Sequence, residues 1–348
     1  MTGYGAAFDW ARRHVEAGRL PTAVLGVATA EGVVALDAFG ATHGRITRVD
    51  DPYWLFSITK VLTGITAARA MERGFLTTET PLTDAIPGFG AGRDVDDVVR
   101  LRHLVSHTAG IPEPTLDPAD GLRAALLVPG RDFAAGTASR YSTVAFDGIV
   151  ELIRHAAGWE WDADISAWSA AIGATGFTLD PGVDPHTVVD AERLGLDMRG
   201  FASHRNPGAG MIGTAADLLA LGSALLRVGQ GETASPGHDR FDGRGGADSP
   251  DDPVRPATLA MMQRPLTGDI PRLDPYPASA GQDWGFTLNL RTRAPGLIDR
   301  DVYGHAGWAG TEFWVHPAAG VAYVLLTNQA DRPGVDADQL DNAVIAGI

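Results

Sequence analysis

Hydrophobic and polar positions follow two different periods near the start of the chain. Between Phe8 and Val15, apolar side chains recur on one helical face with charges between them, which predicts a short amphipathic helix. Apolar runs at 23–28 and 33–39 then flank a Glu-Gly pair, the pattern of a β-hairpin. The chain therefore is expected to begin with a helix followed by two antiparallel strands.

The end of the chain repeats the hairpin pattern. The segment 312–315, which is apolar after Glu312, and the apolar run 321–326 flank a turn from Pro317 to Gly320. The two ends predict one shared antiparallel sheet, whereas the middle indicates mostly helices joined by glycine- and proline-rich connections. The expected fold class is α+β: a sheet formed by both chain ends and flanked by helices, with a mostly helical second region inserted.

Domain boundaries are placed where these patterns change. Residues 1–56 and 280–348 form the expected sheet domain, and residues 57–279 form the expected helical domain. Residues 229–256 hold few side chains that could enter a core, which predicts a solvated loop within the helical domain.

Composition is typical of a soluble globular protein. Of the 348 residues, 45% are hydrophobic and 20% are charged. The net charge of −15 argues against nucleic acid and anionic membranes as partners. No secretory signal and no run of about 18 apolar residues is visible, so a cytoplasmic location is expected. The absence of cysteine excludes disulfides, thiolate metal sites and a cysteine nucleophile.

The basic residues are unequally divided. Of the 28, 27 are arginines, and Lys60 is the only lysine. Arginine keeps its proton above pH ~12, whereas lysine, with an ordinary pKa near ~10.4, becomes a base when burial or a neighbouring cation lowers that pKa. The alternative is a leftover surface lysine, and the residues around Lys60 decide between the two.

The segment around Lys60 predicts a helix. Apolar residues recur at helical spacing from Ile58 to Ala68, and Gly74 suits the left-handed position after the last turn. Ser57 then lies at the helix N-terminus, where free backbone N–H groups point toward any oxyanion formed there. Lys60, three residues on, projects from the same face, close to the serine hydroxyl.

This spacing has a chemical interpretation. A serine hydroxyl is a weak nucleophile until a base removes its proton, and a partly desolvated lysine at i+3 is one such base. Ser57 and Lys60 are therefore candidates for nucleophile and base. The alternative is an ordinary N-cap serine with a lysine nearby by chance.

Two further segments carry candidate side chains. Tyr141 follows a glycine-rich turn just before the apolar run 144–152, and a tyrosine beside a lysine and a serine can relay a proton. His305 comes shortly before the final hairpin and is followed by Ala-Gly, where small residues let a ligand lie close to the strand edge. Taken singly, Tyr141 is more often a core residue and His305 a structural one.

Together these segments resemble the serine β-lactamase and penicillin-binding-protein superfamily, in the branch that holds class C β-lactamases, D,D-peptidases and family VIII esterases. The motifs that carry the resemblance are Ser57-x-x-Lys60, Tyr141-Ser142-Thr143 in place of Tyr-x-Asn, and His305-Ala306-Gly307 in place of Lys-Thr-Gly. Residues 104–112 are similar to the family's L-x-x-H-T-S-G-x-P, and residues 214–218 also agree. The order and spacing of these segments are far more specific than any one of them.

The resemblance implies an acyl-enzyme mechanism that needs no cofactor and no metal. Ser57 would attack a carbonyl carbon, and Lys60 and Tyr141 would shuttle the proton. The backbone N–H groups of Ser57 and Trp308 would form the oxyanion hole, in which each donor is typically worth about 10²–10³ in rate. His305 would take the place of the third motif's lysine and help to hold or polarise the serine–tyrosine region.

Departures from the family pattern bear on the substrate. In members that process β-lactams, the Lys-Thr-Gly hydroxyl contacts the substrate carboxylate and the asparagine of Tyr-x-Asn contacts an amide. Here Ala306 has no hydroxyl and Thr143 offers a single one, so these two residues and Gly307 would line a different substrate site. Losing a charge-assisted hydrogen bond costs about 1.5–3 kcal/mol. We therefore expect hydrolysis of a small-molecule ester or amide rather than efficient β-lactam turnover.

Two other functions stay open. An acyltransferase or peptide cyclase would form the same acyl-enzyme and pass the acyl group to an amine or alcohol, and the sequence barely separates it from a hydrolase. A non-catalytic ligand-binding member of the fold is the third hypothesis, although the joint presence of Ser57, Lys60 and Tyr141 counts against it. The sequence indicates neither the identity of the substrate nor the oligomeric state.

Two remaining patterns indicate structure rather than chemistry. Residues 208–213 match the dinucleotide pattern G-x-G-x-x-G, but no strand leads into them, and Thr214 with Asp217 predicts a capped helix start instead. His103 and His107 are spaced like two metal ligands on one helix face. With no adjacent glutamate and no obvious third ligand, a structural or loop-fixing role is favoured.

Overall fold

One large antiparallel sheet is the centre of the fold. A computed structural model describes residues 3–90, 97–231, 252–268, 270–273, 282–292, 297 and 301–348. The strands are β1 Thr22–Thr29, β2 Gly32–Thr42, β3 Arg45–Ile46, β6 Gln282–Trp284, β7 Asn289–Arg291, β8 Tyr303–Ala306, β9 Glu312–His316 and β10 Val321–Leu326. They form an eight-stranded sheet in the order β3-β2-β1-β10-β9-β8-β7-β6. Two short strands, β4 Tyr53–Trp54 and β5 Ile212–Gly213, pair separately.

Both ends of the chain build this sheet, as the hydrophobic pattern predicts. β1 pairs antiparallel with β10, so that Val24 lies opposite Leu326. The two expected hairpins, β1–β2 and β9–β10, are both present in antiparallel register. The α+β fold class with a sheet from both chain ends is confirmed.

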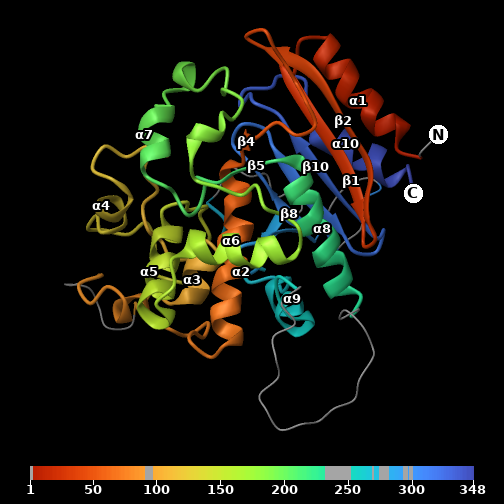
Figure 1. The fold of residues 1–348 in the computed structure, drawn as a ribbon. Helices are drawn as coiled ribbons and strands as arrows, with labels where there is room; N and C mark the ends of the chain where they lie inside the picture. The colour runs from red at the N-terminus through yellow and green to blue at the C-terminus, as the bar shows by residue number, and fades with distance from the viewer. Residues whose placement is uncertain are drawn as a thin grey trace.

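Helices cover both faces of the sheet (Figure 1). α1 (Gly5–Glu16) and α10 (Ala337–Ile345) lie side by side on one face, close to the two termini, and α8 (Ala215–Gly229) packs on the other face against β1 and β10. Successive residues of β1 divide between the two layers, because neighbouring side chains of a strand point to opposite faces. Val24 belongs to the core cluster that contains α8, and Leu25 belongs to the cluster that contains α1.

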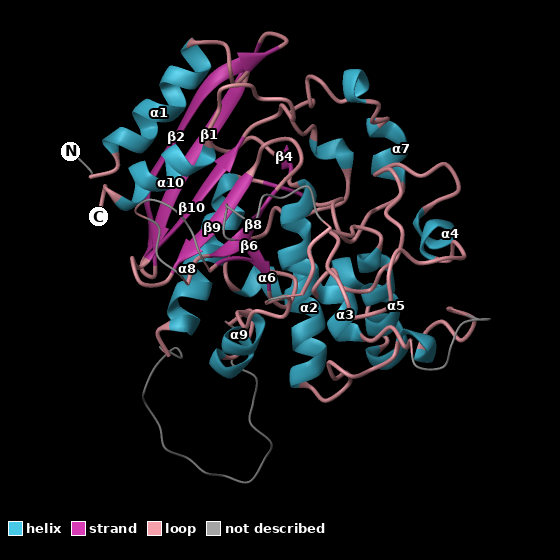
Figure 2. Ribbon diagram, turned by 180° about the vertical axis from the view of Figure 1, so that it is seen from behind, coloured by secondary structure: helices cyan, strands magenta, loops and turns pink. Residues whose placement is uncertain are grey.

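The other helices form a second region beside the sheet (Figure 2). They are α2 Thr59–Glu72, α3 Leu101–Val105, α4 Leu122–Leu126, α5 Ala145–Ala157, α6 Trp161–Ala171, α7 Met198–Ser203 and α9 Pro256–Met262. α2 is almost wholly buried and contacts both α5 and α6. Gly74 adopts a φ of 76° after the last turn of α2, as its position in the sequence predicts.

The start of α8 confirms the expected helix cap. The backbone N–H of Asp217 donates to Thr214 Oγ1 at 3.3 Å, and the backbone N–H of Thr214 donates to the Asp217 carboxylate at 2.9 Å. Most of the predicted loop 229–256 lies outside the described residues, and the two-domain division stays a prediction. Among the helices that the structure describes, none has the length and apolar character that a membrane span requires.

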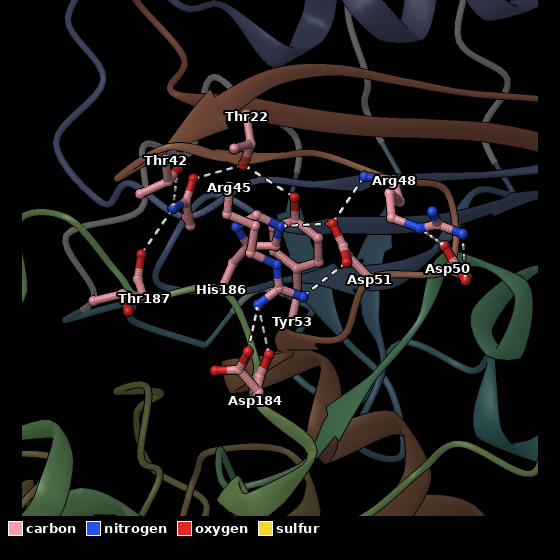
Figure 3. A network of polar contacts seen from close by, with 11 residues as sticks. Thr22, Thr42, Arg45, Arg48, Asp50, Asp51, Tyr53, Asp184, His186 and Thr187 are labelled. Carbon is pink, nitrogen blue, oxygen red and sulfur yellow. Dashed lines mark hydrogen bonds and ion pairs between the residues drawn. The ribbon is translucent and has the colours of Figure 1, made fainter.

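A buried polar network joins the sheet to the segment that leads into Ser57 (Figure 3). Asp51 accepts hydrogen bonds from Arg45 Nη2 at 2.7 Å and from His186 Nε2 at 2.9 Å. Tyr53 stacks on the imidazole of His186, with ring centroids 4.6 Å apart. Its hydroxyl donates to Thr22 Oγ1 at 3.0 Å, which anchors β4 to β1.

Candidate active site

Ser57 lies in a single 3₁₀ turn, η1 (Phe56–Ile58), between β4 and α2. Phe56 has a left-handed φ of 46°, which is uncommon for a bulky residue. Its ring packs against the rings of Phe201 and Trp308, with centroid distances of 5.2 and 5.3 Å. These contacts hold a strained backbone in place, so the chain turns sharply and sets Ser57 at the start of α2.

Lys60 is buried in the first turn of α2 and directs its amine back toward Ser57. Nζ lies 3.1 Å from Ser57 Oγ, 3.2 Å from Thr143 Oγ1 and 2.8 Å from the Gly208 carbonyl oxygen. Three acceptors match the three N–H groups of an ammonium. When Lys60 loses one proton, the lone pair of its amine can accept a hydrogen bond from the O–H of Ser57. The Gly208 carbonyl oxygen has no hydrogen to donate, so it continues to accept an N–H of the amine. The geometry therefore allows Lys60 to take the proton of Ser57.

The environment of Lys60 favours the neutral amine. Burial lowers the pKa of Lys60 from its ordinary value to about 7, although the charge of Glu113 acts in the opposite direction. Nζ also lies 4.7 Å from the ring centroid of Tyr141 and 5.2 Å from that of Phe146. Near neutral pH the amine exists in both protonation states, which is the condition in which a general base is most effective.

Tyr141 and His305 lie together beside this amine. The Tyr141 hydroxyl is 3.5 Å from His305 Nε2. His305 Nδ1 donates to the Ala306 carbonyl oxygen at 2.7 Å, which assigns Nε2 as the acceptor of the neutral ring. Burial, with a further effect from the charge of Lys60, lowers the pKa of His305 to about 3. His305 can therefore receive the Tyr141 O–H but does not supply the positive charge of a lysine.

His107 fixes the backbone on both sides of Tyr141. Its Nδ1 accepts the N–H of Ser142 at 3.1 Å, and its carbonyl oxygen accepts the N–H of Arg140 at 2.9 Å. The two rings of His107 and Tyr141 are in contact, with centroids 4.6 Å apart. His107 itself has a left-handed φ of 59°. These contacts agree with a loop-fixing role.

His103, the other histidine of this pair, has a separate contact. Its Nδ1 accepts the backbone N–H of Arg100 at 3.1 Å at the start of α3. Within the described residues, no group of three or more histidine, aspartate or glutamate side chains is arranged to hold a metal ion.

The turn after β8 borders Ser57. Gly307 has no space for a side chain, because a Cβ there would collide with the Leu55 carbonyl oxygen and with Thr311 Oγ1. Thr311 Oγ1 donates to the same Leu55 carbonyl at 3.2 Å and ties the turn to η1. In the described part of the chain, no acceptor takes up the backbone N–H of Trp308, which leaves this N–H free to bind an oxyanion.

The three residues expected to contact substrate have distinct surroundings. The Thr143 side chain is buried, and its hydroxyl is in contact with Lys60. Ala306 packs against the core cluster that includes α1 and α10. Gly307 lies in the turn beside Leu55.

The sequence motifs do not reveal two contacts of the site. One is the Gly208 carbonyl, which accepts from Lys60; the segment is fixed because Gly208 N–H donates to Asn206 Oδ1 at 2.8 Å. A Cβ on Gly208 would lie 2.9 Å from Thr143 atoms. The glycine at this position is therefore the sequence feature that could have indicated the close contact. The other is Glu113, which directly follows the 104–112 segment and binds the backbone of Thr143.

A separate cavity adjoins the nucleophile segment. Trp54 lines a cavity of about 750 Å³ together with Met198 and Ala202 from α7 and with residues of the 179–188 segment. Ser57, Lys60 and Tyr141 are not among the lining residues, so this cavity is not the site of the candidate chemistry.

Sequence comparisons identify related proteins. The chain matches the Beta-lactamase family model over residues 8–347. It is similar to esterase EstB of Burkholderia gladioli, with 27% identity over 322 residues that cover 82% of this chain and 80% of EstB. A shorter match to the ML-236A carboxylate methylbutanoyltransferase mlcH of Penicillium citrinum has 33% identity over 84 residues, which are 20% of each chain.

Solved structures share the fold across almost the whole chain. EstCE1, a hydrolase with promiscuous acyltransferase activity, superposes with a TM-score of 0.73 and 20% identity, covering 98% of this chain and 97% of EstCE1. A mutant of the simvastatin synthase LovD of Aspergillus terreus gives a TM-score of 0.72 and 18% identity, covering 98% and 93%. Because the family model spans nearly every residue that builds the sheet and the site, the chain belongs to the β-lactamase family.

Proposed function

We propose that this protein is a serine hydrolase that cleaves a small-molecule ester or amide through an acyl-enzyme on Ser57. The observation that carries the proposal is the 3.1 Å contact between Ser57 Oγ and the buried Nζ of Lys60. Burial lowers the pKa of that amine to about 7, so part of the amine is neutral and can act as a base near neutral pH. The similarity to esterase EstB supports the ester as substrate class.

In the acylation step, Ser57 Oγ attacks the carbonyl carbon while its proton passes to Lys60 Nζ. The backbone N–H groups of Ser57 and Trp308 stabilise the oxyanion that forms. The bond to the leaving group then breaks, and the proton passes from Lys60, directly or through the Tyr141 hydroxyl, to the leaving alcohol or amine. The products are the acyl-enzyme and the protonated leaving group.

In the deacylation step, water replaces the leaving group. Lys60 takes a proton from the water as its oxygen attacks the acyl-enzyme carbonyl, and the same two N–H groups stabilise the second oxyanion. The ester bond to Ser57 Oγ breaks, the proton returns to Oγ, and the carboxylic acid product leaves. The chain ends each cycle with Ser57 and Lys60 in their initial states.

The third motif favours an uncharged substrate. His305 is neutral because burial lowers its pKa to about 3, and Ala306 has no hydroxyl. The carboxylate of a β-lactam therefore finds neither the positive charge nor the hydroxyl that this motif supplies in Lys-Thr-Gly members, and we expect poor β-lactam turnover.

A steady-state assay tests this proposal. We expect the wild-type protein to hydrolyse a p-nitrophenyl acyl ester, and Ser57→Ala to lower kcat/KM by at least ~10³-fold. Ser166→Ala, which removes an exposed hydroxyl on α6, is the matched control and keeps the wild-type rate. Absence of turnover by the wild type, or equal turnover by Ser57→Ala, rejects the proposal.

Acyl transfer is a second candidate function. It is favoured by the local similarity to the methylbutanoyltransferase mlcH. Product analysis in the presence of competing amines and alcohols separates transfer from hydrolysis: an acylated acceptor supports a transferase, and exclusive release of the acid supports a hydrolase. More than one turnover per molecule excludes a non-catalytic ligand-binding protein, which a permanent, unhydrolysed adduct would favour.

A further inference from the structure

Glu113 lies at the N-terminus of α5 and binds the backbone there. Its Oε1 and Oε2 accept the N–H of Thr143 at 2.7 and 2.8 Å, and Oε2 also accepts the N–H of Val144 at 3.3 Å. These N–H groups precede the first residue of α5 and have no partner within the helix. A carboxylate in this position is also favoured by the positive end of the helix dipole.

Thr143 connects this carboxylate to the candidate base. Its backbone N–H binds Glu113, while its hydroxyl oxygen lies 3.2 Å from Lys60 Nζ. The hydroxyl of Thr143 is fixed against the amine only as long as the backbone of Thr143 is fixed. A continuous path of polar contacts therefore runs from Glu113 through Thr143 to Lys60.

The charges around Lys60 give Glu113 a second effect. The titratable groups that face the amine are the imidazoles of His107 and His305, the phenol of Tyr141, and the carboxylate of Glu113. Burial first, and then the charge of Lys60, lowers the pKa of both imidazoles, so both are neutral at physiological pH. The carboxylate is the group whose charge favours the ammonium form of Lys60.

We propose that Glu113 is a positioning residue for the Ser57–Lys60 pair, because it holds Thr143 against the amine and directs a negative charge at it. The inference rests on the proposed function of this pair. Without the carboxylate, burial acts unopposed and Lys60 loses its proton at lower pH, which makes it a weaker base. A weaker base takes a proton from a serine hydroxyl less readily.

The single lysine of the chain permits a direct test. Lysine labelled with ¹³C at Cε gives one side-chain signal, that of Lys60, and its titration followed by NMR reports the pKa of this amine alone. We expect Glu113→Gln, which keeps one acceptor oxygen, to lower the pKa of Lys60 by at least ~0.5. The acid limb of the kcat/KM profile for a p-nitrophenyl ester shifts to lower pH by the same amount, and kcat falls by roughly 5–10-fold.

Three further variants complete the experiment. Glu113→Asp keeps the charge and gives a smaller shift than Glu113→Gln. Glu113→Ala removes charge and acceptors together, shifts the pKa at least as far, and serves if the glutamine variant fails to fold. Asp336→Asn, which removes an exposed carboxylate that accepts the N–H of Asp338 at the start of α10, leaves the titration of Lys60 unchanged.

An unchanged Lys60 titration in folded Glu113→Gln or Glu113→Ala overturns the inference. So does a shift of equal size in Asp336→Asn, since the effect would then not depend on proximity. The NMR titration requires no turnover, so it tests Glu113 even if the wild-type protein hydrolyses no ester. In that case the proposed function fails while the inference about Glu113 stands or falls on its own readout.

Discussion

Lys60 shows how a buried amine is accommodated at the scale of one residue. Each of its possible N–H donors has an acceptor: Ser57, Thr143 and Gly208. The sequence predicted the contact with Ser57, because a spacing of three residues on a helix determines it. The contact with Gly208 spans 148 residues and depends on the fold, so no local pattern could predict it.

Replacing the lysine separates its effects on stability and on catalysis. Burial lowers the pKa of Lys60 to about 7 in the folded protein, whereas the unfolded value is ~10.4. Between these two pH values the unfolded chain binds more protons at Lys60 than the folded protein does. The buried lysine therefore destabilises the fold most below pH 7, and this destabilisation declines as the pH rises. We expect Lys60→Met to raise stability by roughly 1–4 kcal/mol at pH 6, and by less at pH 9.

The same variant is expected to lower kcat/KM by at least ~10³-fold, since it removes the proposed base for Ser57. Chemical unfolding at the two pH values and an ester assay measure both effects. Lower stability at pH 6 together with retained activity would contradict the account of Lys60.

His305 provides a second test at this scale. Its pKa is lowered to about 3, so we expect Lys60, and not His305, to determine the fall of kcat/KM on the acid side of the pH profile. We expect His305→Asn to reduce kcat/KM by roughly 10-fold, while this fall stays near pH 7. The dependence of kcat/KM on pH, measured for the wild type and the variant, tests this prediction. If the fall of kcat/KM on the acid side is lost in His305→Asn, then His305, not Lys60, is the titrating base.

At the scale of elements, the site depends on three segments that meet: η1 with α2, the segment that carries Tyr141, and β8 with the turn after it. Of the elements of the fold, the helix α2, its end at Gly74 and the capped start of α8 were predictable from spacing and capping residues. The left-handed Phe56 was not, because its backbone is held by aromatic contacts with Phe201 and Trp308 from distant parts of the chain. The sequence therefore predicted that Ser57 and Lys60 lie together, but not the turn that presents Ser57.

The close approach of β8 to η1 makes Gly307 a sensitive position. A Cβ would collide with the Leu55 carbonyl oxygen, so the turn that carries the Trp308 N–H has to move away from Ser57. A displacement of about 1 Å can cost 10²-fold in rate, and we expect a loss of this order in kcat/KM for Gly307→Ala.

Gly5→Ala is the matched control, because a Cβ at Gly5 meets no atom within 4 Å. The ester assay compares the two variants. If Gly307→Ala keeps activity within about 2-fold of the wild type, the N–H of Trp308 is not required in its present position.

At the scale of the whole molecule, both ends of the chain build one sheet, and the helical region lies beside it (Figure 1). Long apolar runs predicted β1, β2, β9 and β10. The strands β6, β7 and β8 have three to four residues each, too short for a clear period. The network around Asp51 (Figure 3) also escaped prediction, since its partners come from segments that are distant in sequence.

This network predicts a dependence of stability on pH. Burial raises the pKa of Asp51, but hydrogen bonds from Arg45, His186 and the Arg48 N–H outweigh it, and the net pKa is lowered. The ionised carboxylate therefore stabilises the fold above its unfolded pKa of ~3.9, and this contribution is lost as the pH falls through the folded value.

We expect Asp51→Asn to destabilise the protein by roughly 1–3 kcal/mol at pH 7, since it weakens hydrogen bonds to charged groups. The difference from the wild type narrows below pH ~4, where the unfolded chain binds a proton at Asp51, and it is lost as the pH falls through the lower pKa of the folded protein. Urea unfolding of both proteins at several pH values measures this difference in the free energy of unfolding. A difference that does not change with pH would contradict a role for the ionised carboxylate.

Covalent labelling of Ser57 is the most direct test of the central claim that a buried amine activates this serine. The protein is incubated with a fluorophosphonate probe at a series of pH values, and the adduct is located by peptide mass spectrometry. We predict one adduct, on Ser57, whose rate of formation rises as the pH increases through about 7, because Lys60 has to be neutral. No adduct, an adduct on another residue, or a rate independent of pH would contradict the account.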